Sequence, residues 1–301
     1  MMNSRGINHQ TKYNIEYDIE ADWVIGLLCN FNCEYCISHT GKKYQDQDTG
    51  NRFIEFFNLS GKRWLLHITG GEPFLYPNFI ELCVLLTRNH KINLNTNLSS
   101  SLVYDFARII DPSKVTFINI GLHIVEREKY DLINDFIDKY KYLKDKGFSL
   151  IVSYVMYPAL ISRFEKDYEY FKSLGIIVSP KSLRGVFFGK RFPEAYTATE
   201  KKAFSKYSLT AENEAGSGEF LTEPIINLSL DRKFVEKSPN YKGKMCLAGK
   251  DFVRIFPDGK ITRCDKKTVI GNVFDKKLEL YSKARICDTF SCPYFCAKYS
   301  I

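Results

Sequence analysis

Three cysteines lie within eight residues in the stretch LLCNFNCEYC, where Cys29, Cys33 and Cys36 have the spacing C-x3-C-x2-C. Clustered thiolates form a disulfide framework, a zinc site or the anchor of an iron–sulfur cluster. Three thiolates on one loop hold three irons of a [4Fe-4S] cube and leave the fourth iron open to a substrate or cofactor. A zinc site needs a fourth ligand, which His39 could supply, so this alternative stays open.

The composition of the chain argues against disulfides. The chain has 301 residues, and neither its polar N-terminus nor any internal run has the apolar length of a signal peptide or a membrane span. We therefore expect a cytoplasmic globular protein without membrane association, in which nine cysteines serve as metal ligands or buried thiols. The net charge of +8 is spread along the chain, which favours an anionic ligand and gives little support for nucleic acid.

A second motif, Gly70-Gly71-Glu72-Pro73, follows an apolar run. Glycines at such a position let the backbone approach a ligand that a side chain would keep away. A plain strand-to-helix turn is the alternative for this motif taken alone.

Apolar, β-branched and aromatic runs alternate with amphipathic segments over the first 180 residues. The runs cover 23–28, 63–69, 91–96, 114–122, 149–156 and 175–180. One amphipathic segment places Phe79, Cys83 and Leu86 on an apolar face, and another is closed by Gly147. Repeated βα units of this kind predict a parallel sheet curled into a whole or partial barrel, with ligands at the carboxyl ends of the strands.

The cysteine loop after the first strand and the Gly-Gly-Glu-Pro motif after the second together resemble the radical S-adenosylmethionine (radical SAM) superfamily. Tyr35, the aromatic residue before the last cysteine, belongs to the same signature. The resemblance implies a partial (β/α)6 barrel of the TIM type, with a [4Fe-4S] cluster on Cys29, Cys33 and Cys36. It further implies that S-adenosylmethionine binds the open iron and is cleaved to methionine and a 5′-deoxyadenosyl radical, which removes a hydrogen from the substrate.

The resemblance also assigns cofactor contacts to residues at the strand ends. The Gly-Gly-Glu-Pro motif would bind the methionine amino group, and Asn95 to Asn97 stand where relatives commonly have Thr-Asn-Gly, with Leu98 in place of the glycine. Arg184 could hold the S-adenosylmethionine carboxylate, a solvated rim being the alternative. The predicted cofactor-binding residues are Tyr35, Gly70, Gly71, Glu72, Pro73, Asn95, Asn97 and Arg184.

The end of the fourth expected strand supplies the candidate catalytic residue. Gly121 stands where many relatives have a serine that contacts the ribose, and a glycine has no hydroxyl for this contact. His123 follows at the active face, and we predict it as a substrate contact or acid/base group, with a structural histidine as the alternative.

Five further cysteines lie in the C-terminal part of the chain. Cys246 and Cys264 flank an expected hairpin that turns at 257–259, in the pattern C-x12-G-x4-C. This pattern resembles the auxiliary-cluster modules called SPASM and twitch domains, and five cysteines suffice for a second [4Fe-4S] cluster; a zinc ribbon is the alternative. The predicted ligands are Cys246, Cys264, Cys287, Cys292 and Cys296, of which the last two are favoured over Cys287 by their i, i+4 spacing.

We therefore predict a radical SAM core barrel over 1–209, a linker over 210–240 and an auxiliary-cluster domain over 241–301. The predicted substrate is a small polar metabolite, carbohydrate-like or nucleotide-like, that is oxidised, epimerised or rearranged, with a flavodoxin- or ferredoxin-type electron donor. The basic residues Lys181, Arg184, Lys190 and Arg191 suit an anionic group on such a ligand.

Two alternatives to this function remain. The first is a peptide-modifying radical SAM enzyme, although the start of the cysteine loop at residue 29 is expected to leave no room for a leader-binding domain. The second is a non-catalytic metal-stabilised scaffold or electron carrier, which would not explain the Gly-Gly-Glu-Pro motif.

Overall fold

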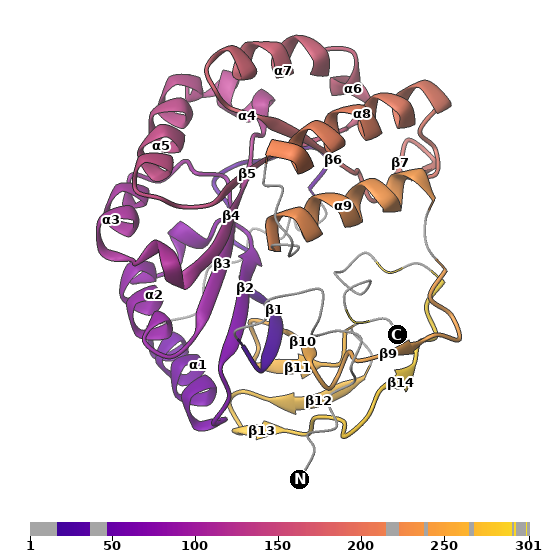
Figure 1. Cartoon of the computed structure of the whole chain (residues 1–301). Coiled ribbons are helices and arrows are strands. Elements are labelled where there is room, and N and C mark those ends of the chain that lie inside the picture. Colours follow the sequence, from indigo (N-terminus) through magenta and orange to yellow (C-terminus); the bar gives the residue numbers. More distant parts are fainter. Residues whose placement is uncertain are drawn as a thin grey trace.

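The first six strands pair in parallel in chain order and are joined by helices (Figure 1). The structure, a computed structural model, describes residues 17–36, 47–214, 223–237, 240–264 and 268–290, together with residues 292 and 299. The six strands are β1 (Ile19–Gly26), β2 (Trp64–Gly70), β3 (Lys91–Thr96), β4 (Val115–Gly121), β5 (Leu150–Val155) and β6 (Val178–Lys181). The predicted parallel sheet of a partial barrel is confirmed.

Helices cover the outer face of this sheet (Figure 1). They are α1 (Gln47–Leu59), α2 (Phe79–Thr87), α3 (Leu102–Ile109), α4 (Ile124–Lys129), α5 (Ile133–Asp145), α6 (Pro158–Ile161) and α7 (Phe164–Ser173), with 3-10 turns η1 (Pro73–Leu75) and η2 (Pro112–Lys114). Gly147 has φ +86° just after α5, as expected of a glycine that closes a helix. No helix in the ranges given above is long and apolar enough to cross a membrane.

Strand alternation divides the side chains between the two faces of the sheet. In β2, Trp64, Leu66 and Ile68 are fully buried in the large core beneath the outer helices. His67 points to the opposite, inner face and lies 2.5 Å from Glu20 of β1. A parallel strand that is buried on both faces has a continuous hydrophobic sequence. The polar residues in β1 and β2 therefore show that the inner face is more polar than the outer face.

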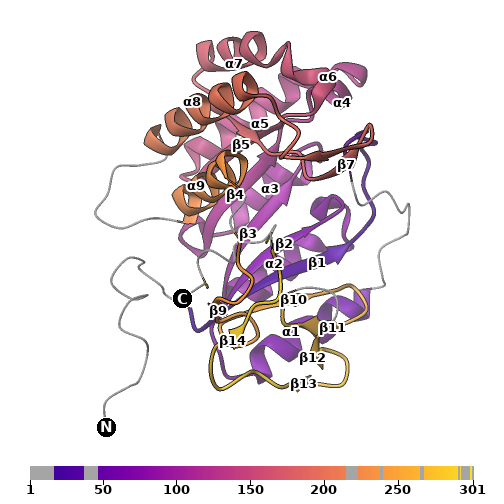
Figure 2. The same cartoon turned by 90° about the vertical axis from the view of Figure 1, so that its right-hand side faces the viewer.

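Two helices lie over the inner face, where a linker was predicted. They are α8 (Ala198–Glu214) and α9 (Glu223–Glu236), which follow a two-stranded ribbon of β7 (Gly185–Phe187) and β8 (Lys190–Phe192). The two helices lie over the strands of the barrel sheet (Figures 1 and 2). Ala211 and Leu228 pack against the inward side chains Phe117 and Ile151. α8 ends within the predicted linker 210–240 and α9 lies inside it, so most of this range is helical.

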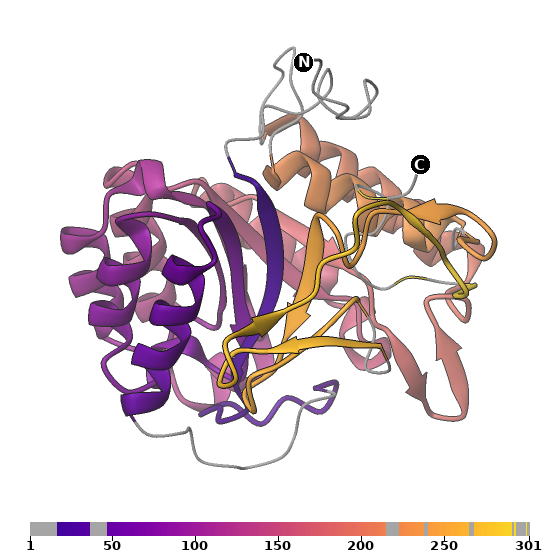
Figure 3. The ribbon, with the colours of Figure 1, turned by 90° about the horizontal axis from the view of Figure 1, so that it is seen from below.

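The C-terminal module continues the barrel sheet. Its strands are β9 (Met245–Cys246), β10 (Phe252–Ile255), β11 (Lys260–Thr262), β12 (Val269–Asn272), β13 (Lys277–Leu278) and β14 (Arg285–Ile286). β10 pairs in parallel with β1, and β10 to β13 extend the sheet beyond it as antiparallel neighbours (Figure 3). The predicted hairpin is confirmed, with Gly259 at φ +78° in its turn.

Candidate functional site

The cysteine loop runs from the end of β1 into a tight turn. Cys36 donates its backbone N–H to the carbonyl of Cys33 at 3.0 Å. Burial raises the pKa of the Cys33 thiol to about 12, with smaller rises from the charges of Glu126, Cys29 and Cys36. All three cysteines lie on the described loop after β1. A metal would have to displace the Cys33 proton, because the thiolate is the form that ligates.

The arrangement of acidic, histidine and cysteine side chains bears on the choice between a cluster and a single ion. Among the described residues, no three such side chains come close enough together to bind one metal ion. A [4Fe-4S] cluster would take each cysteine on a different iron, whereas a zinc ion would need four ligands around one point. His39, the fourth ligand of the zinc alternative, lies outside the described residues.

Gly70 and Gly71 hold the cysteine loop against the end of β2. A Cβ on Gly71 would lie 1.9 Å from the carbonyl oxygen of Leu28, and one on Gly70 would lie 2.1 Å from that of Gly26. The two segments instead bond directly: the N–H of Gly71 donates to Gly26 at 2.9 Å and that of Glu72 donates to Leu28 at 2.8 Å. The glycines are thus required by the backbone that leads into Cys29, a reason that differs from the ligand approach inferred from sequence.

Glu72 is a buried acceptor that joins the ends of β2 and β3. Its carboxylate accepts hydrogen bonds from the N–H of Phe74 at 3.1 Å, the hydroxyl of Thr96 at 2.7 Å and the N–H of Asn97 at 2.6 Å. Burial raises the pKa of Glu72 to about 6, and these hydrogen bonds oppose the rise. Because the side chain is engaged by the protein, a contact from this motif to a ligand amino group would come from its backbone. Pro73 begins the turn η1 directly behind it.

Asn97 and Leu98 shape the loop after β3. The side-chain amide of Asn97 lies 3.8 Å from the sulfur of Cys29 and donates to Asn30 at 2.9 Å. Leu98 has φ +57°, a left-handed conformation in which a glycine is favoured. The glycine of the Thr-Asn-Gly pattern is therefore replaced here by a buried leucine that keeps the backbone conformation.

His123 lies against the cysteine loop, beside the predicted cofactor residue Tyr35. Its Nδ1 is 2.9 Å from the Tyr35 hydroxyl and 3.3 Å from the sulfur of Cys33. Its ring fills the space above Gly121, where a Cβ would lie 2.0 Å from Nε2. Burial lowers the pKa of His123 to about 3, helped by the charge of Arg127, so the ring is neutral at neutral pH. A serine at position 121 would collide with this ring.

Arg127 was not predicted as a site residue, because its neighbours in the sequence are charged residues typical of a solvent-exposed helix. It is fully buried and donates from Nε to the carbonyl of Leu122 at 2.6 Å and from Nη2 to the carbonyls of Gly121 and Asn97. Burial lowers the pKa of Arg127 to about 10. This guanidinium fixes the ends of β3 and β4 relative to each other.

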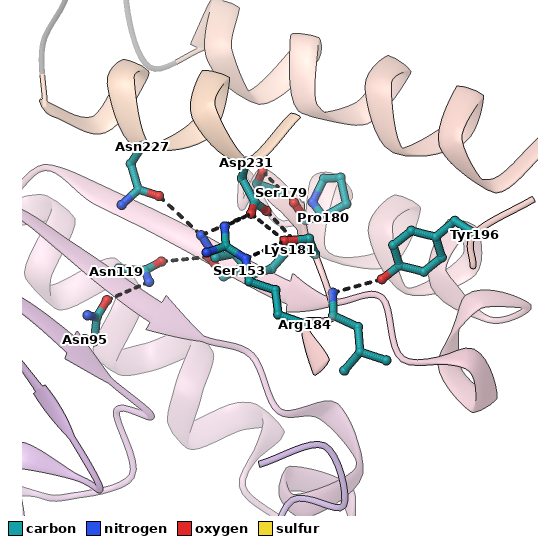
Figure 4. Close-up of polar contacts among 12 residues, drawn as sticks. Asn95, Asn119, Ser153, Ser179, Pro180, Lys181, Arg184, Tyr196, Asn227 and Asp231 are labelled. Carbon is teal, nitrogen blue, oxygen red and sulfur yellow. Dashed lines mark hydrogen bonds and ion pairs between the residues drawn. The ribbon is translucent and has the colours of Figure 1, made fainter. Parts of the chain in front are cut away.

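Amide and hydroxyl groups form a row across the inner face, from β3 to β5 (Figure 4). Asn119 donates from Nδ2 to the side-chain oxygen of Asn95 at 2.7 Å, and Ser153 donates its hydroxyl to Asn119 at 2.7 Å. Asn95, predicted from sequence, and Asn119 are partly exposed, whereas Asn93, two residues earlier on β3, is buried. Solvent therefore reaches the inner face toward the carboxyl ends of the strands.

The row continues to a charged cluster at the end of β6. Asp231 of α9 accepts from the backbone and hydroxyl of Ser182 at 2.8 and 2.6 Å, and from Arg184 at 2.7 Å (Figure 4). Arg184, the predicted partner of a ligand carboxylate, is thus paired with a protein carboxylate and lies over the Phe234 ring. No sequence signal marked Asp231, because its partners come from a distant strand.

Three of the C-terminal cysteines meet in one apolar cluster. Cys246 is buried there, with Cys264 and Cys287 packed against the same cluster. Burial raises the pKa of the Cys246 thiol, while the N–H of Ala248 and the Arg263 guanidinium lower it. Cys292 is disulfide-bonded in the structure, which departs from the expectation that the chain has no disulfides. Cys296 lies outside the described residues, and the predicted role of both cysteines as ligands stays a prediction.

Arg263 ties together the segments that carry these three cysteines. It donates from Nε to the carbonyl of Ala248 at 3.0 Å, from Nη1 to that of Ile286 at 3.1 Å and from Nη2 to that of Arg285 at 3.1 Å. The guanidinium therefore fixes the segments that carry the three thiols relative to one another.

Comparison with known sequences finds a family match over the N-terminal part of the chain. Residues 23–171 match the family described as the Radical SAM superfamily. Over 111 residues, the chain is 24% identical to a probable GTP 3′,8-cyclase of Pyrococcus abyssi and 23% identical to one of Pyrococcus horikoshii. These matches cover 36% of this chain and 36% and 35% of the two proteins, so the chain spans about a third of the length of these curated relatives.

Solved structures share the fold of nearly the whole chain. The structure of native anSMEcpe with bound AdoMet and the Kp18Cys peptide matches with a TM-score of 0.59 at 15% identity, over 85% of this chain and 78% of that one. SuiB of Streptococcus suis bound to its precursor peptide SuiA matches with a TM-score of 0.57 at 13% identity, over 87% and 63%. At this identity, the likeness shows the common fold.

Proposed function

We propose that this radical SAM enzyme removes a hydrogen atom from a small polar metabolite, carbohydrate-like or nucleotide-like, and thereby oxidises, epimerises or rearranges it. Membership of the family implies a [4Fe-4S] cluster and S-adenosylmethionine. When bound, this pair supplies a 5′-deoxyadenosyl radical, formed together with methionine when one electron cleaves S-adenosylmethionine. The remaining chemistry belongs to the residues of this chain, which bind, orient and shield the reacting groups.

The three thiols of the cysteine loop and the residues around them suit a [4Fe-4S] cluster. Cys29, Cys33 and Cys36 would hold the cluster, and the backbone of Gly70 and Gly71 supports the loop from beneath. The side-chain amide of Asn97 would donate toward the Cys29 sulfur. Arg127 donates to the backbone carbonyl of Asn97 and so keeps the end of β3 in place. Hydrogen bonds to cluster sulfurs tune the reduction potential of such clusters.

The observation that carries the choice of substrate is the polar row on the inner face. Asn95, Asn119 and Ser153 present amide and hydroxyl groups in fixed orientations, which suit the hydroxyls or ring nitrogens of a small polar molecule. The named activity of the Pyrococcus relatives, GTP 3′,8-cyclase, supports a nucleotide-like member of this class. Fixed polar groups of this kind reject ligands that cannot pair with them.

A peptide substrate is the second candidate. The solved structures with the same fold include complexes with the Kp18Cys peptide and with the precursor peptide SuiA. The two-stranded ribbon β7–β8, with Val186 and Phe188 exposed, offers an apolar edge that an extended peptide could cover.

We further propose one auxiliary [4Fe-4S] cluster at the C-terminal module, on Cys246, Cys264 and at least one of the later cysteines. The support is the buried thiol of Cys246, with the partly buried Cys264 and Cys287 packed against the same cluster beside Arg263. A cluster there would accept an electron from the substrate radical or deliver one to it, while a flavodoxin- or ferredoxin-type protein would reduce the first cluster. Replacement of Cys29, Cys33 and Cys36 by alanine would remove the first cluster. The iron that this variant retains, about four per chain, would then measure the auxiliary cluster.

Isotope transfer tests the substrate class directly. The anaerobic, reconstituted enzyme would be incubated with dithionite, S-adenosylmethionine and uniformly deuterated candidates from three groups: nucleotides, aminosugars and peptides. We expect deuterium in 5′-deoxyadenosine from a member of one of the first two groups. Deuterium from a peptide alone would overturn the metabolite proposal and support the second candidate.

A further inference from the structure

Lys181 ends β6 on the inner face, where its side chain is 29% exposed. Its ammonium lies 3.8 Å from the carboxylate of Asp231 and 3.4 Å from the side-chain oxygen of Asn227, both on α9 (Figure 4). A contact of 3.8 Å is an ion pair without a hydrogen bond, and 3.4 Å lies at the long end of the hydrogen-bond range. The ammonium therefore keeps hydrogen-bonding capacity toward the inner face.

The charge of Asp231 is already balanced by another cation. Arg184 approaches the same carboxylate oxygen at 2.7 Å, and Ser182 donates to the carboxylate twice. These shorter contacts fasten α9 to the end of β6. One carboxylate facing two cations leaves a net positive charge, and Lys181 is the cation with the longer contact. Burial lowers the pKa of Lys181 even beside this carboxylate, which agrees with incomplete compensation.

The row of amides extends from Lys181 toward the cysteine loop. Its far end is Asn95, whose amide nitrogen has no hydrogen-bond partner in the described part of the chain, since Asn119 occupies only its oxygen. Asn97, two residues beyond, contacts Cys29. Three strand spacings separate β3 from β6, which is about 14 Å across the sheet, a span on the scale of a nucleotide or a disaccharide.

We propose that Lys181 is an oxyanion subsite that binds a carboxylate or phosphate at the end of the substrate remote from the cysteine loop. The inference rests on the proposed function, which it deepens by requiring an anionic group on the metabolite. Asp231 and Asn227 hold the ammonium toward the inner face, while Arg184 keeps Asp231 neutralised. An oxyanion there meets a charged donor beside a buried network, where such contacts are stronger than on an open surface.

Anion binding to the reconstituted, anaerobic enzyme tests this subsite. The probes are inorganic phosphate and acetate, titrated at constant ionic strength against chloride, with the thermal unfolding midpoint as the readout. We expect at least one probe to raise the midpoint of the parent enzyme and of Lys181→Arg. In Lys181→Gln, the half-saturating concentration should rise by roughly tenfold or more, since a charge-assisted hydrogen bond is lost. A response to phosphate alone or to acetate alone assigns the anion.

Lys141→Gln is the matched control, because it removes one exposed lysine from α5, which covers the outer face of the sheet (Figure 1). It should keep the response of the parent enzyme. Equal responses in Lys181→Gln and the parent, equal losses in both glutamine variants, or no specific response in the parent would each overturn the subsite. The anion titration measures binding and does not depend on hydrogen abstraction. If the enzyme binds anions at Lys181 but abstracts hydrogen only from peptides, the proposed function is wrong and the subsite is still supported.

Discussion

Replacement of Gly71 by alanine is expected to detach the cysteine loop while the barrel stays folded. The new Cβ would start 1.9 Å from the Leu28 carbonyl oxygen, and an ordinary contact begins at 3.4 Å, so this carbonyl must retreat by about 1.5 Å. Such a movement breaks the 2.8 Å hydrogen bond from Glu72 to Leu28 and strains the 2.9 Å bond from Gly71 to Gly26. Two lost or weakened backbone bonds, partly desolvated, correspond to about 2–4 kcal/mol.

Anaerobic reconstitution measures the consequence, because Cys29 directly follows Leu28. The Gly71→Ala chain should keep its far-ultraviolet circular dichroism but lose the S-adenosylmethionine-sensitive electron paramagnetic resonance signal, with about four fewer irons per chain. Gly50→Ala is the matched control, since a Cβ in α1 would meet Tyr76 at an ordinary 3.5 Å. Unchanged iron and an unchanged unfolding midpoint in Gly71→Ala would refute the reasoning.

Three further predictions concern the polar groups of the two sites. Burial raises the pKa of Glu72 from 4.5 to about 6, so the folded chain binds the Glu72 proton more tightly than the unfolded chain does. The contribution of Glu72 to the free energy of unfolding therefore falls as the pH rises from about 4.5 to 6. Glu72→Gln should remove this trend from the unfolding midpoint of the metal-free protein, and a difference from the parent that is constant with pH would contradict it. Arg263→Gln, in a chain whose first three cysteines are alanine, should lose most of its retained iron, with partial rescue by Arg263→Lys; equal iron retention in all three would show that the guanidinium is dispensable. Gly121→Ser should lower the unfolding midpoint in the parent but little in a His123→Ala background, because the collision is with that ring; equal losses would exclude the collision.

Strand bounds were predicted well from the sequence where a strand is apolar on both faces of the sheet. β3 has the bounds predicted from its run, whereas β1 begins four residues earlier than expected, because Glu20 and Asp22 point to the inner face and look like loop residues in the sequence. α9 was missed for a related reason: Asp231 is buried only through partners at the end of β6.

The site was predicted where motifs are local, as in the cysteine loop and the Gly-Gly-Glu-Pro turn. Residues such as Arg127 and Arg263 could not be predicted, because their roles depend on carbonyl groups that tertiary folding brings together. The role of Gly71 also needed the fold, since the obstacle to a side chain is the backbone of a neighbouring loop.

The most direct test of the account is the formation of 5′-deoxyadenosine by the reconstituted protein with dithionite and S-adenosylmethionine. We predict that it forms, and that it disappears when Cys29, Cys33 and Cys36 are replaced by alanine. No 5′-deoxyadenosine from a protein that carries a full complement of iron on these cysteines, or undiminished formation by the alanine variant, would contradict the assignment of this loop as the site of radical generation.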